Sequence, residues 1–398
     1  NFETYGLKKE RLQFWNFSPS NRSRTFTTGS ECYYVAWNKK PGKLVQAEMS
    51  NAATDYVPYT LNIADEITSK KALLGYDSII DSGFTEKCTE YSSLLVGDYI
   101  NNVEAPIDFE TFLFFTDPHL AESSGWENRC REMMLQIKKY YDTTPVSFCL
   151  CGGDWLGNSD LPSTACYKLG YVYGMMRDMF SKPYLIVGNH DTNYQGKKDS
   201  ESQTFTTRLS NQSISDLWYR ENKKTYYEFN GNSTKFYCFD SGTENQPLES
   251  YNNYGMSQAI WFADSLLTNT KSHLAIVSHI LYNDLPTNSE ICPLMSTVID
   301  IAYAFNNRTT VDVNNVHYDF SDCTGNVEFI VAGHSHNDYN GIINGIPYFM
   351  TTNVRHGTGM RASFDLVMVD YDTGNINLIR VGTGSNRVIS LSTGELVQ

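Results

Sequence analysis

Five short apolar runs constrain the fold of this chain more than any other feature of its sequence. Runs that are apolar throughout are typical of strands covered on both faces. Segments with apolar residues at helical spacing lie between several of them, and this alternation predicts a layered α/β domain. The runs are TFLFFT, VSFCLCG, PYLIVG, LAIVS and EFIVAG, at residues 111–116, 146–152, 183–188, 274–278 and 328–333.

Each apolar run is followed by side chains of the types that bind metals. Loops at the carboxyl ends of strands in an α/β sheet face a shared crevice. If the five strands are parallel neighbours, these side chains converge there. One histidine at a strand end is more often structural, but five such coincidences indicate a site. The candidates are Asp117, His119, Asp154, Asn189, His279, His334 and His336.

The candidate ligands are carboxylates, an amide and imidazoles, without a thiolate. This mixture suits zinc, manganese or iron ions. Seven ligands exceed the needs of one catalytic ion with an open position, whereas two ions sharing a carboxylate would use them all. Two ions ~3.5–4 Å apart can hold both the attacking and the leaving oxygen of a displacement. We therefore expect two divalent ions.

The first part of the chain differs in character from the rest. Residues 1–105 contain no histidine and offer pieces with strand character, such as ECYYVAW and SSLLVGDYI. We predict a small β-rich accessory module there and a second domain over 106–398, with a linker near Pro106. In the second domain, Asn230-Gly231 predicts the turn of a hairpin. The segments 192–223 and 281–327 are expected to shape a pocket, and the second of them is expected to be irregular.

Charge and cysteine usage narrow the class of protein. The net charge is −14 and no basic run occurs, which argues against a nucleic-acid-binding surface. No apolar stretch reaches the ~18 residues of a transmembrane helix. No CxxC pair occurs, and spacing permits Cys32–Cys88, Cys130–Cys166 and Cys292–Cys323 disulfides without establishing them. Richness in Tyr, Asn, Ser and Thr favours an extracellular, periplasmic or cell-surface location over a cytoplasmic one.

The motifs DPH, GGD, GNHD, a strand-ending histidine and GHSH, in this order, resemble those of the calcineurin-like metallophosphoesterases. The resemblance covers residue 111 to about residue 390 and implies a four-layer α/β/β/α sandwich around two metals. By motif, it implies that Asp117, His119 and His336 hold one ion. It assigns the other ion to Asn189, His279 and His334, with Asp154 bridging the two.

The resemblance also implies hydrolysis of a phosphomonoester or phosphodiester by a hydroxide that bridges the metals. His190 would lie near the phosphoryl group, and Asp191 would orient its imidazole. Many members have an acidic or tyrosyl residue three positions after the bridging aspartate, where this chain has Gly157. The further candidates for substrate contacts are Asn158, Arg355 and His356.

Two other functions are compatible with the sequence. One is a cell-surface protein that binds glycans or cell walls through residues 1–105, with a relict metal domain; the intact set of candidate ligands counts against it. The other is cleavage of a pyrophosphate bond in a nucleotide derivative. The expected partner is a small-molecule or cell-envelope phosphoester, and the sequence does not indicate the oligomeric state.

Overall fold

The chain forms two compact units, one of residues 1–75 and 93–107 and the other of residues 76–92 and 108–398. The computed structural model describes residues 2–5, 11–15, 34–37, 84–101, 108–120, 126–157, 162–193, 209–218, 224–241, 248–282, 291–354 and 362–397. None of the helices in these ranges is long and apolar enough to cross a lipid bilayer.

In the smaller unit the structure describes an antiparallel sheet of three strands in the order β2-β1-β3. The strands are β1 (Phe2–Tyr5), β2 (Arg11–Trp15) and β3 (Tyr34–Trp37). The predicted boundary between residues 105 and 106 stays a prediction; the division in the structure differs in placing residues 76–92 with the larger unit.

The segment SSLLVGDYI was expected to have strand character, but it lies in helix α2 (Phe84–Asn101). The buried residues Phe84, Cys88 and Tyr91 recur at helical spacing just before it. Phe84 packs edge-on against Tyr140, with ring centroids 4.7 Å apart. The Tyr91 hydroxyl donates a hydrogen bond to the Val367 carbonyl at 2.8 Å. Packing of this apolar face therefore favours a helix, although the local sequence of SSLLVGDYI favours a strand.

The larger unit is built on two six-stranded sheets, ordered β17-β16-β15-β4-β5-β6 and β13-β14-β12-β9-β8-β7. Strands β4, β5 and β6 run parallel in the first sheet, and β8, β9, β12 and β14 run parallel in the second. The first sheet comprises β4 (Phe109–Phe115), β5 (Phe148–Cys151), β6 (Pro183–Leu185), β15 (Phe364–Asp370), β16 (Asn375–Val381) and β17 (Arg387–Ser390). The second comprises β7 (Tyr227–Asn230), β8 (Thr234–Phe239), β9 (His273–Ser278), β12 (Asn326–Ala332), β13 (Tyr339–Ile343) and β14 (Ile346–Met350).

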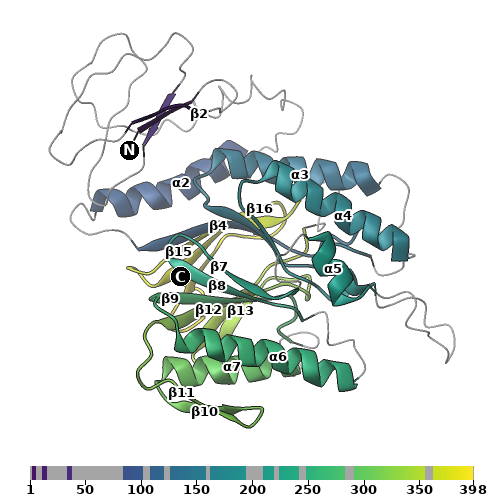
Figure 1. Ribbon diagram of the computed structural model, residues 1–398. Helices are drawn as coiled ribbons and strands as arrows, with labels where there is room; N and C mark the ends of the chain where they lie inside the picture. The colour runs from purple at the N-terminus through teal and green to yellow at the C-terminus, as the bar shows by residue number, and fades with distance from the viewer. Residues whose placement is uncertain are drawn as a thin grey trace. The chain divides into compact units, whose positions relative to one another are not determined.

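Helices cover the outer face of each sheet, so the larger unit is the expected four-layer α/β/β/α sandwich (Figure 1). Helices α3 (Trp126–Thr143) and α4 (Pro162–Met179) lie on the first sheet, and α6 (Leu248–Leu267) and α7 (Pro293–Asn306) on the second. The remaining described elements are the 3-10 helix His190–Thr192, α5 (Asn211–Leu217), β10 (Thr310–Val313) and β11 (Val316–Asp319).

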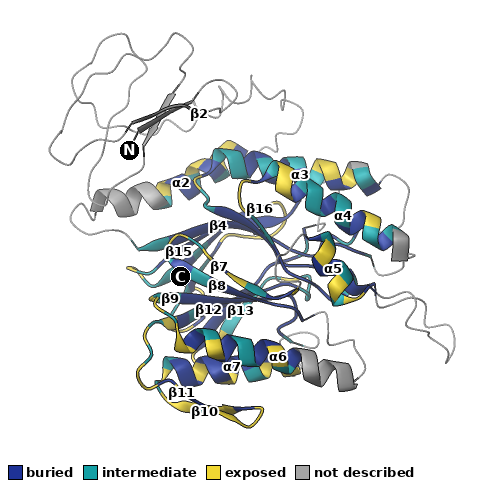
Figure 2. Ribbon diagram, viewed as in Figure 1, coloured by how far each residue is buried: buried dark blue, intermediate teal, exposed yellow. Residues whose placement is uncertain are grey.

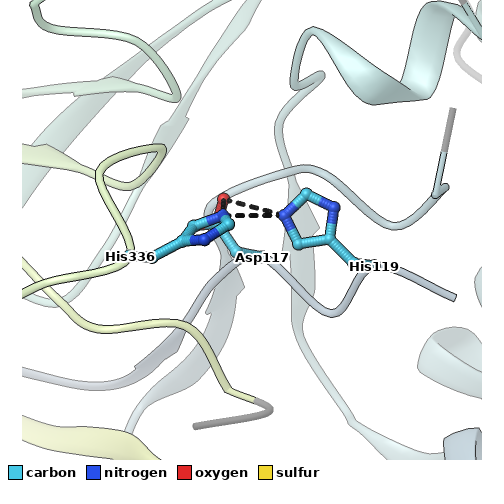
Figure 3. A group of neighbouring side chains, drawn as sticks. All are labelled: Asp117, His119 and His336. Atoms are coloured by element: carbon cyan, nitrogen blue, oxygen red, sulfur yellow. Dashed lines mark hydrogen bonds and ion pairs between the residues drawn. The ribbon is translucent and has the colours of Figure 1, made fainter. Parts of the chain in front are cut away.

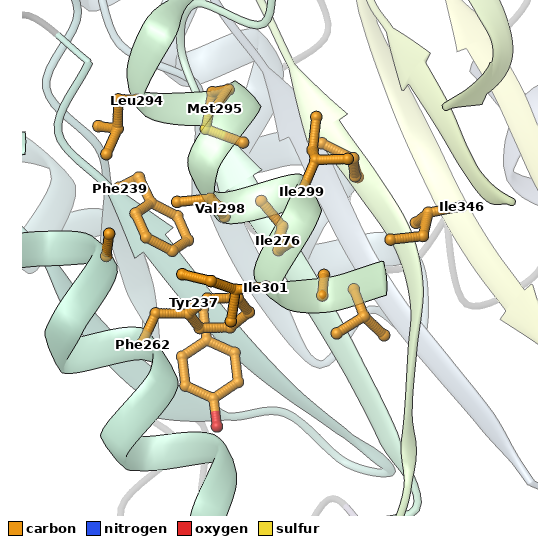
Figure 4. Close-up of a cluster of buried hydrophobic side chains, with 14 of the residues drawn as sticks. Tyr237, Phe239, Phe262, Ile276, Leu294, Met295, Val298, Ile299, Ile301 and Ile346 are labelled. Carbon is orange, nitrogen blue, oxygen red and sulfur yellow. The ribbon is translucent and has the colours of Figure 1, made fainter. Parts of the chain in front are cut away.

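Strands β4, β5, β9 and β12 are buried along most of their length on both faces, as their apolar composition predicts (Figure 2). Phe112 and Phe114 of β4 belong to the core between the sheets. On the second sheet, Phe239 packs with Phe262 of α6 and Val298 of α7 in an outer core (Figure 4). Burial of each such side chain contributes roughly 1.5–3 kcal/mol, so these layers hold the strand ends, and whatever follows them, in fixed places.

Two expectations about this domain are revised by the structure. The five strands are not neighbours in one sheet: β4, β5 and β6 belong to one and β9 and β12 to the other. Segment 281–327 is not irregular where the structure describes it, because it contains α7 and the β10–β11 hairpin. The predicted hairpin at Asn230-Gly231 is confirmed as β7–β8.

Candidate metal centre

The loops that carry the candidate ligands meet at one end of the sandwich. Asp117 and His119 follow β4, and Asp154 and Asn189 follow β5 and β6. The three candidate histidines of the second sheet, His279, His334 and His336, follow β9 and β12. Backbone hydrogen bonds join adjacent loops: the Asp117 N–H donates to Gly153 at 3.0 Å, and the Gly333 N–H donates to His279 at 3.1 Å.

One group of candidate ligands consists of Asp117, His119 and His336 (Figure 3). One ligand atom from each lies within 4.8 Å of the others. The Nε2 atoms of His119 and His336 are 2.8 Å apart, and Nε2 of His336 is 3.2 Å from Oδ1 of Asp117. Three ligand atoms this close, drawn from two sheets, can coordinate one ion.

A second group consists of Asp154, His279 and His334, whose ligand atoms also lie within 4.8 Å of one another. Nε2 of His279 is 3.0 Å from Oδ2 of Asp154, and the rings of His279 and His334 are 5.3 Å apart. Oδ2 of Asp154 is also 3.8 Å from Nε2 of His119. Asp154 therefore lies between the two groups.

Several polar atoms of these residues are buried without a hydrogen-bond partner. They include Oδ1 of Asp117, Oδ1 of Asn189 and Nε2 of His279. A buried polar atom left unsatisfied costs about 1–3 kcal/mol. The Nδ1 atom of His279 is 2.7 Å from the Gly152 carbonyl, the contact that leaves Nε2 as the ligand atom of a metal-binding histidine. This donor set fits divalent cations.

The electrostatics of the site also favour positive charge. Burial opposes a charge on His279, but the carboxylates of Asp154 and Asp117 outweigh it and raise the pKa of His279 to about 10. Burial and the neighbouring charge of His279 lower the pKa of His334 to about 4. The raised pKa favours the protonated form of His279 beside the two carboxylates. Because ligand imidazoles must be neutral, metal binding would displace that proton.

Five of the seven candidates have a left-handed backbone. Such a conformation costs a residue with a side chain roughly 1–2 kcal/mol, and strain of this kind concentrates at functional sites. The φ angles are 57° at Asp117, 44° at His119, 59° at Asp154, 70° at His334 and 56° at His336. The sharp turns aim side chains from different strands at one point.

Glycines beside the candidate ligands permit close approach. A Cβ on Gly188 would lie 2.1 Å from Oδ1 of Asp154, and one on Gly333 would lie 2.2 Å from Oγ1 of Thr116. These distances are far below van der Waals contact. The glycines of the GNHD and GHSH motifs are therefore required by the packing of the loops.

His190 lies beside both groups. Its backbone N–H donates to Oδ1 of Asp154 at 2.8 Å, and its ring packs edge-on against His119 with centroids 4.6 Å apart. Its Nδ1 atom is buried without a hydrogen-bond partner. Burial lowers the pKa of His190, against the opposing effect of Asp154.

Asp191 does not orient the imidazole of His190, contrary to the expectation. Its carboxylate accepts four backbone N–H groups instead. Oδ1 accepts from Trp155 at 2.7 Å and Leu156 at 3.2 Å; Oδ2 accepts from Asp154 at 3.0 Å and Gly188 at 2.9 Å. Burial and the Asp154 carboxylate raise the pKa of Asp191 to about 7, although these N–H groups favour its charged form. Asp191 thus clamps the two loops that carry Asp154 and Asn189.

The remaining sequence-based candidates have mixed outcomes. Asn158, Arg355 and His356 lie outside the described residues. Thr116 was missed although it directly precedes Asp117; its hydroxyl donates to Oδ2 of Asp117 at 2.6 Å. Its position at the end of an apolar run was the available signal.

Two histidines lie away from the centre. His273 directly precedes the apolar run LAIVS, a position that predicts a solvated side chain, but its ring stacks on Tyr371 and contacts Glu328 at 3.0 Å and Asp108 at 2.8 Å. His317 is a surface residue, with 64% of its side chain exposed.

The described cysteines bear on two of the permitted disulfides. Neither Cys130–Cys166 nor Cys292–Cys323 forms, because Cys130, Cys166 and Cys323 are thiols. Cys149 and Cys151 are buried thiols, as their place in an apolar strand predicts.

Comparisons with known proteins bear on the family of this chain. A model described as calcineurin-like phosphoesterase matches residues 110–338. A search of curated proteins found no match. Similar solved structures include the calcineurin-like phosphoesterase YfkN from Bacillus subtilis, with 13% identity, coverage of 74% of this chain and 93% of that chain, and a TM-score of 0.37. GAP50, the anchor in the inner membrane complex of Plasmodium, shows 12% identity, coverage of 73% and 87%, and a TM-score of 0.38. The phosphopantetheinyl hydrolase PptH from Mycobacterium tuberculosis shows 12% identity, coverage of 64% and 96%, and a TM-score of 0.35.

Proposed function

Because the chain belongs to the calcineurin-like phosphoesterase family, we propose that it hydrolyses a phosphomonoester or phosphodiester at a centre of two divalent ions. The observation that carries the proposal is the pair of ligand groups, Asp117, His119 and His336 beside Asp154, His279 and His334. Each group offers three ligand atoms within 4.8 Å, and each contains a buried polar atom without a hydrogen-bond partner, Oδ1 of Asp117 in one and Nε2 of His279 in the other.

The chain's own residues divide between the two ions in this proposal. Asp117, His119 and His336 would hold one, His279 and His334 the other together with Asn189, and Asp154 would contact both. Bound ions would supply charge that stabilises a phosphoryl group and would lower the pKa of a water at the site. Zinc, manganese and iron suit these ligands.

His190 is proposed to contact the phosphoryl group. Its side chain is 24% exposed and lies 3.8 Å from Oδ2 of Asp154, so it borders the ligand groups while remaining accessible. An imidazole in this place can hydrogen bond to the phosphoryl oxygens or protonate the leaving oxygen. Asp191 would act indirectly, by holding the backbone from which Asp154 and His190 project.

The proposed substrate is a small-molecule or cell-envelope phosphoester, and we propose that the enzyme acts outside the cytoplasm. The composition supports the location, with 27 tyrosines and few charged residues for its size. The net charge of −14 disfavours a polyanionic partner such as nucleic acid.

The replacement Asp154→Asn tests the proposal. The replacement removes a carboxylate charge that both ligand groups use, so we expect a lower metal content and slower hydrolysis. Replacing a residue that only supports a metal ligand typically lowers metal affinity or activity by about 10–100-fold, and we expect a larger loss of activity here. Metal analysis of the purified protein, with nitrophenyl phosphate and bis-nitrophenyl phosphate as substrates and several divalent ions, provides the measurement. Asp312→Asn, which changes a carboxylate 76% exposed on the β10–β11 hairpin, is the matched control. Full activity of Asp154→Asn would refute the proposal.

A further inference from the structure

A buried arginine of the first sheet has all of its hydrogen-bond donors occupied. Arg380, on β16, is 1% exposed. Its Nε donates to Oδ1 of Asp365 at 2.8 Å, and its Nη2 donates to Oδ2 of Asp365 at 3.0 Å. Nη1 and Nη2 donate to the two carboxylate oxygens of Asp338 at 2.9 Å and 2.6 Å, and Nη1 also donates to the Thr383 carbonyl at 2.9 Å. A guanidinium has five N–H groups, and here each has an acceptor.

The carboxylate of Asp338 connects this arginine to the loop of a candidate ligand. Asp338 lies two residues after His336, in the loop between β12 and β13. Its Oδ1 also accepts the backbone N–H of Thr352 at 3.0 Å. The Thr352 hydroxyl in turn donates to the carbonyl of His336 at 2.9 Å. A continuous set of contacts therefore runs from Arg380 to the backbone of His336.

This set of contacts crosses from one sheet to the other. Arg380 and Asp365 lie on β16 and β15 of the first sheet, whereas Asp338 and Thr352 flank β13 and β14 of the second. Asp365, which is fully buried, also accepts from the Thr351 hydroxyl at 2.6 Å. The loop of His336 is thus fixed against the opposite sheet.

The ion pair between Arg380 and Asp338 is not explained by stability alone. Replacing a buried ion pair by apolar side chains of similar volume often leaves the folded state as stable or more stable. Gly384 must also lack a side chain, since a Cβ there would lie 2.6 Å from Nη1 of Arg380. The bidentate pair does fix the positions of the two side chains relative to each other. His336 needs this fixed geometry, because its side chain is 42% exposed and its backbone has a φ of 56°.

We propose that Arg380, Asp338 and Thr352 are positioning residues that fix His336 and so set the affinity of the ion held with Asp117 and His119. The inference rests on the proposed function, because it requires that two ions bind. The set of contacts touches none of Asp154, His279 and His334, so the other ion should bind with unchanged affinity.

Isothermal titration calorimetry of the metal-free protein with manganese ions tests the proposal without any measurement of catalysis. Asp338→Asn keeps the side-chain shape but weakens the bond to Arg380. Thr352→Val removes the hydroxyl without changing charge, and Thr352→Ser, which keeps it, is the matched control. His336→Gln identifies which binding event belongs to His336. Melting temperatures show whether each variant folds. If Asp338→Asn does not fold, the test relies on Thr352→Val.

The expected result is a weakening of the His336 event in Asp338→Asn and Thr352→Val by about 10–100-fold, with the second event changed by less than about twofold. Thr352→Ser should bind like the wild type. Two unchanged events, or two events weakened equally, would overturn the positioning role while leaving the proposed function intact. A wild-type protein that binds no manganese and hydrolyses no phosphoester would overturn the proposed function instead, and the inference with it.

Discussion

The replacement Asp191→Asn tests the clamp between the loops that carry Asp154 and Asn189. The carboxylate accepts two backbone N–H groups on each oxygen. An asparagine has a single acceptor oxygen, and its NH2 group would face the other two N–H groups. Whichever way the amide is turned, two buried donors lose their acceptor.

The structure sets the size of the expected effect. Each buried donor left without an acceptor costs about 1–3 kcal/mol, so two cost roughly 2–6 kcal/mol. That is a large part of the about 5–15 kcal/mol that stabilises a typical domain. Asp191 is fully buried, so water cannot easily replace the lost bonds.

Urea unfolding of the metal-free protein, followed by tryptophan fluorescence, measures the loss in unfolding free energy. Hydrogen exchange at the amides of Asp154, Trp155, Leu156 and Gly188 locates it. Asp370→Asn is the matched control: one oxygen of Asp370 accepts from the N–H groups of Asp372 and Thr373, and the other from the Thr373 hydroxyl. An asparagine can satisfy all three partners there, so we expect a loss below about 1 kcal/mol. Equal losses in the two variants, or unchanged exchange at the four amides, would refute the clamp.

Two further predictions concern other parts of the sandwich. Burial lowers the pKa of His273, but its hydrogen bonds to Glu328 and Asp108 outweigh burial and raise the pKa above the ordinary value. The stabilisation that His273 provides should therefore be complete below pH ~6.5 and disappear as the pH rises through the raised pKa. Melting temperatures of wild type and His273→Gln from pH 5.5 to 9 should therefore converge toward alkaline pH, and a constant difference would contradict this. Gly188→Ala should displace the Asp154 carboxylate, because the added Cβ would lie 2.1 Å from it. We expect the metal content to fall more than in Gly174→Ala, where a Cβ meets nothing within 4 Å. Equal metal content in the two variants would show that the loop can adjust.

The strands and the places of the candidate ligands could be predicted because both are local properties. An uninterrupted apolar run such as TFLFFT indicates a strand with two covered faces, and the residue types after it indicate ligands. The family resemblance implied a sandwich with two sheets, but which strand belongs to which sheet could not be predicted, because no local pattern says which strands pair.

The contacts that support the site were not predictable in the same way. Asp338, Asp365 and Arg380 are far apart in the sequence, and each alone reads as an ordinary charged residue. Asp191 was assigned to His190 from the family resemblance, but its carboxylate oxygens accept backbone N–H groups of Asp154, Trp155 and Leu156, in a loop distant in the sequence. His273 looked solvated because it precedes an apolar run, and its carboxylate partners come from β12 and the segment before β4.

The order of strands in the first sheet has a consequence for how the protein would acquire its ions during synthesis. β4 lies between β5 and β15, and β15 is made only after every strand of the second sheet. Asp117 and Asp154 therefore leave the ribosome well before the sheet that holds them can close, and His336 emerges late. Neither ligand group can be complete on the nascent chain until most of it has been made. Since metal availability is one of the factors that decide which metal a protein binds, the compartment in which folding finishes would influence which ion is bound.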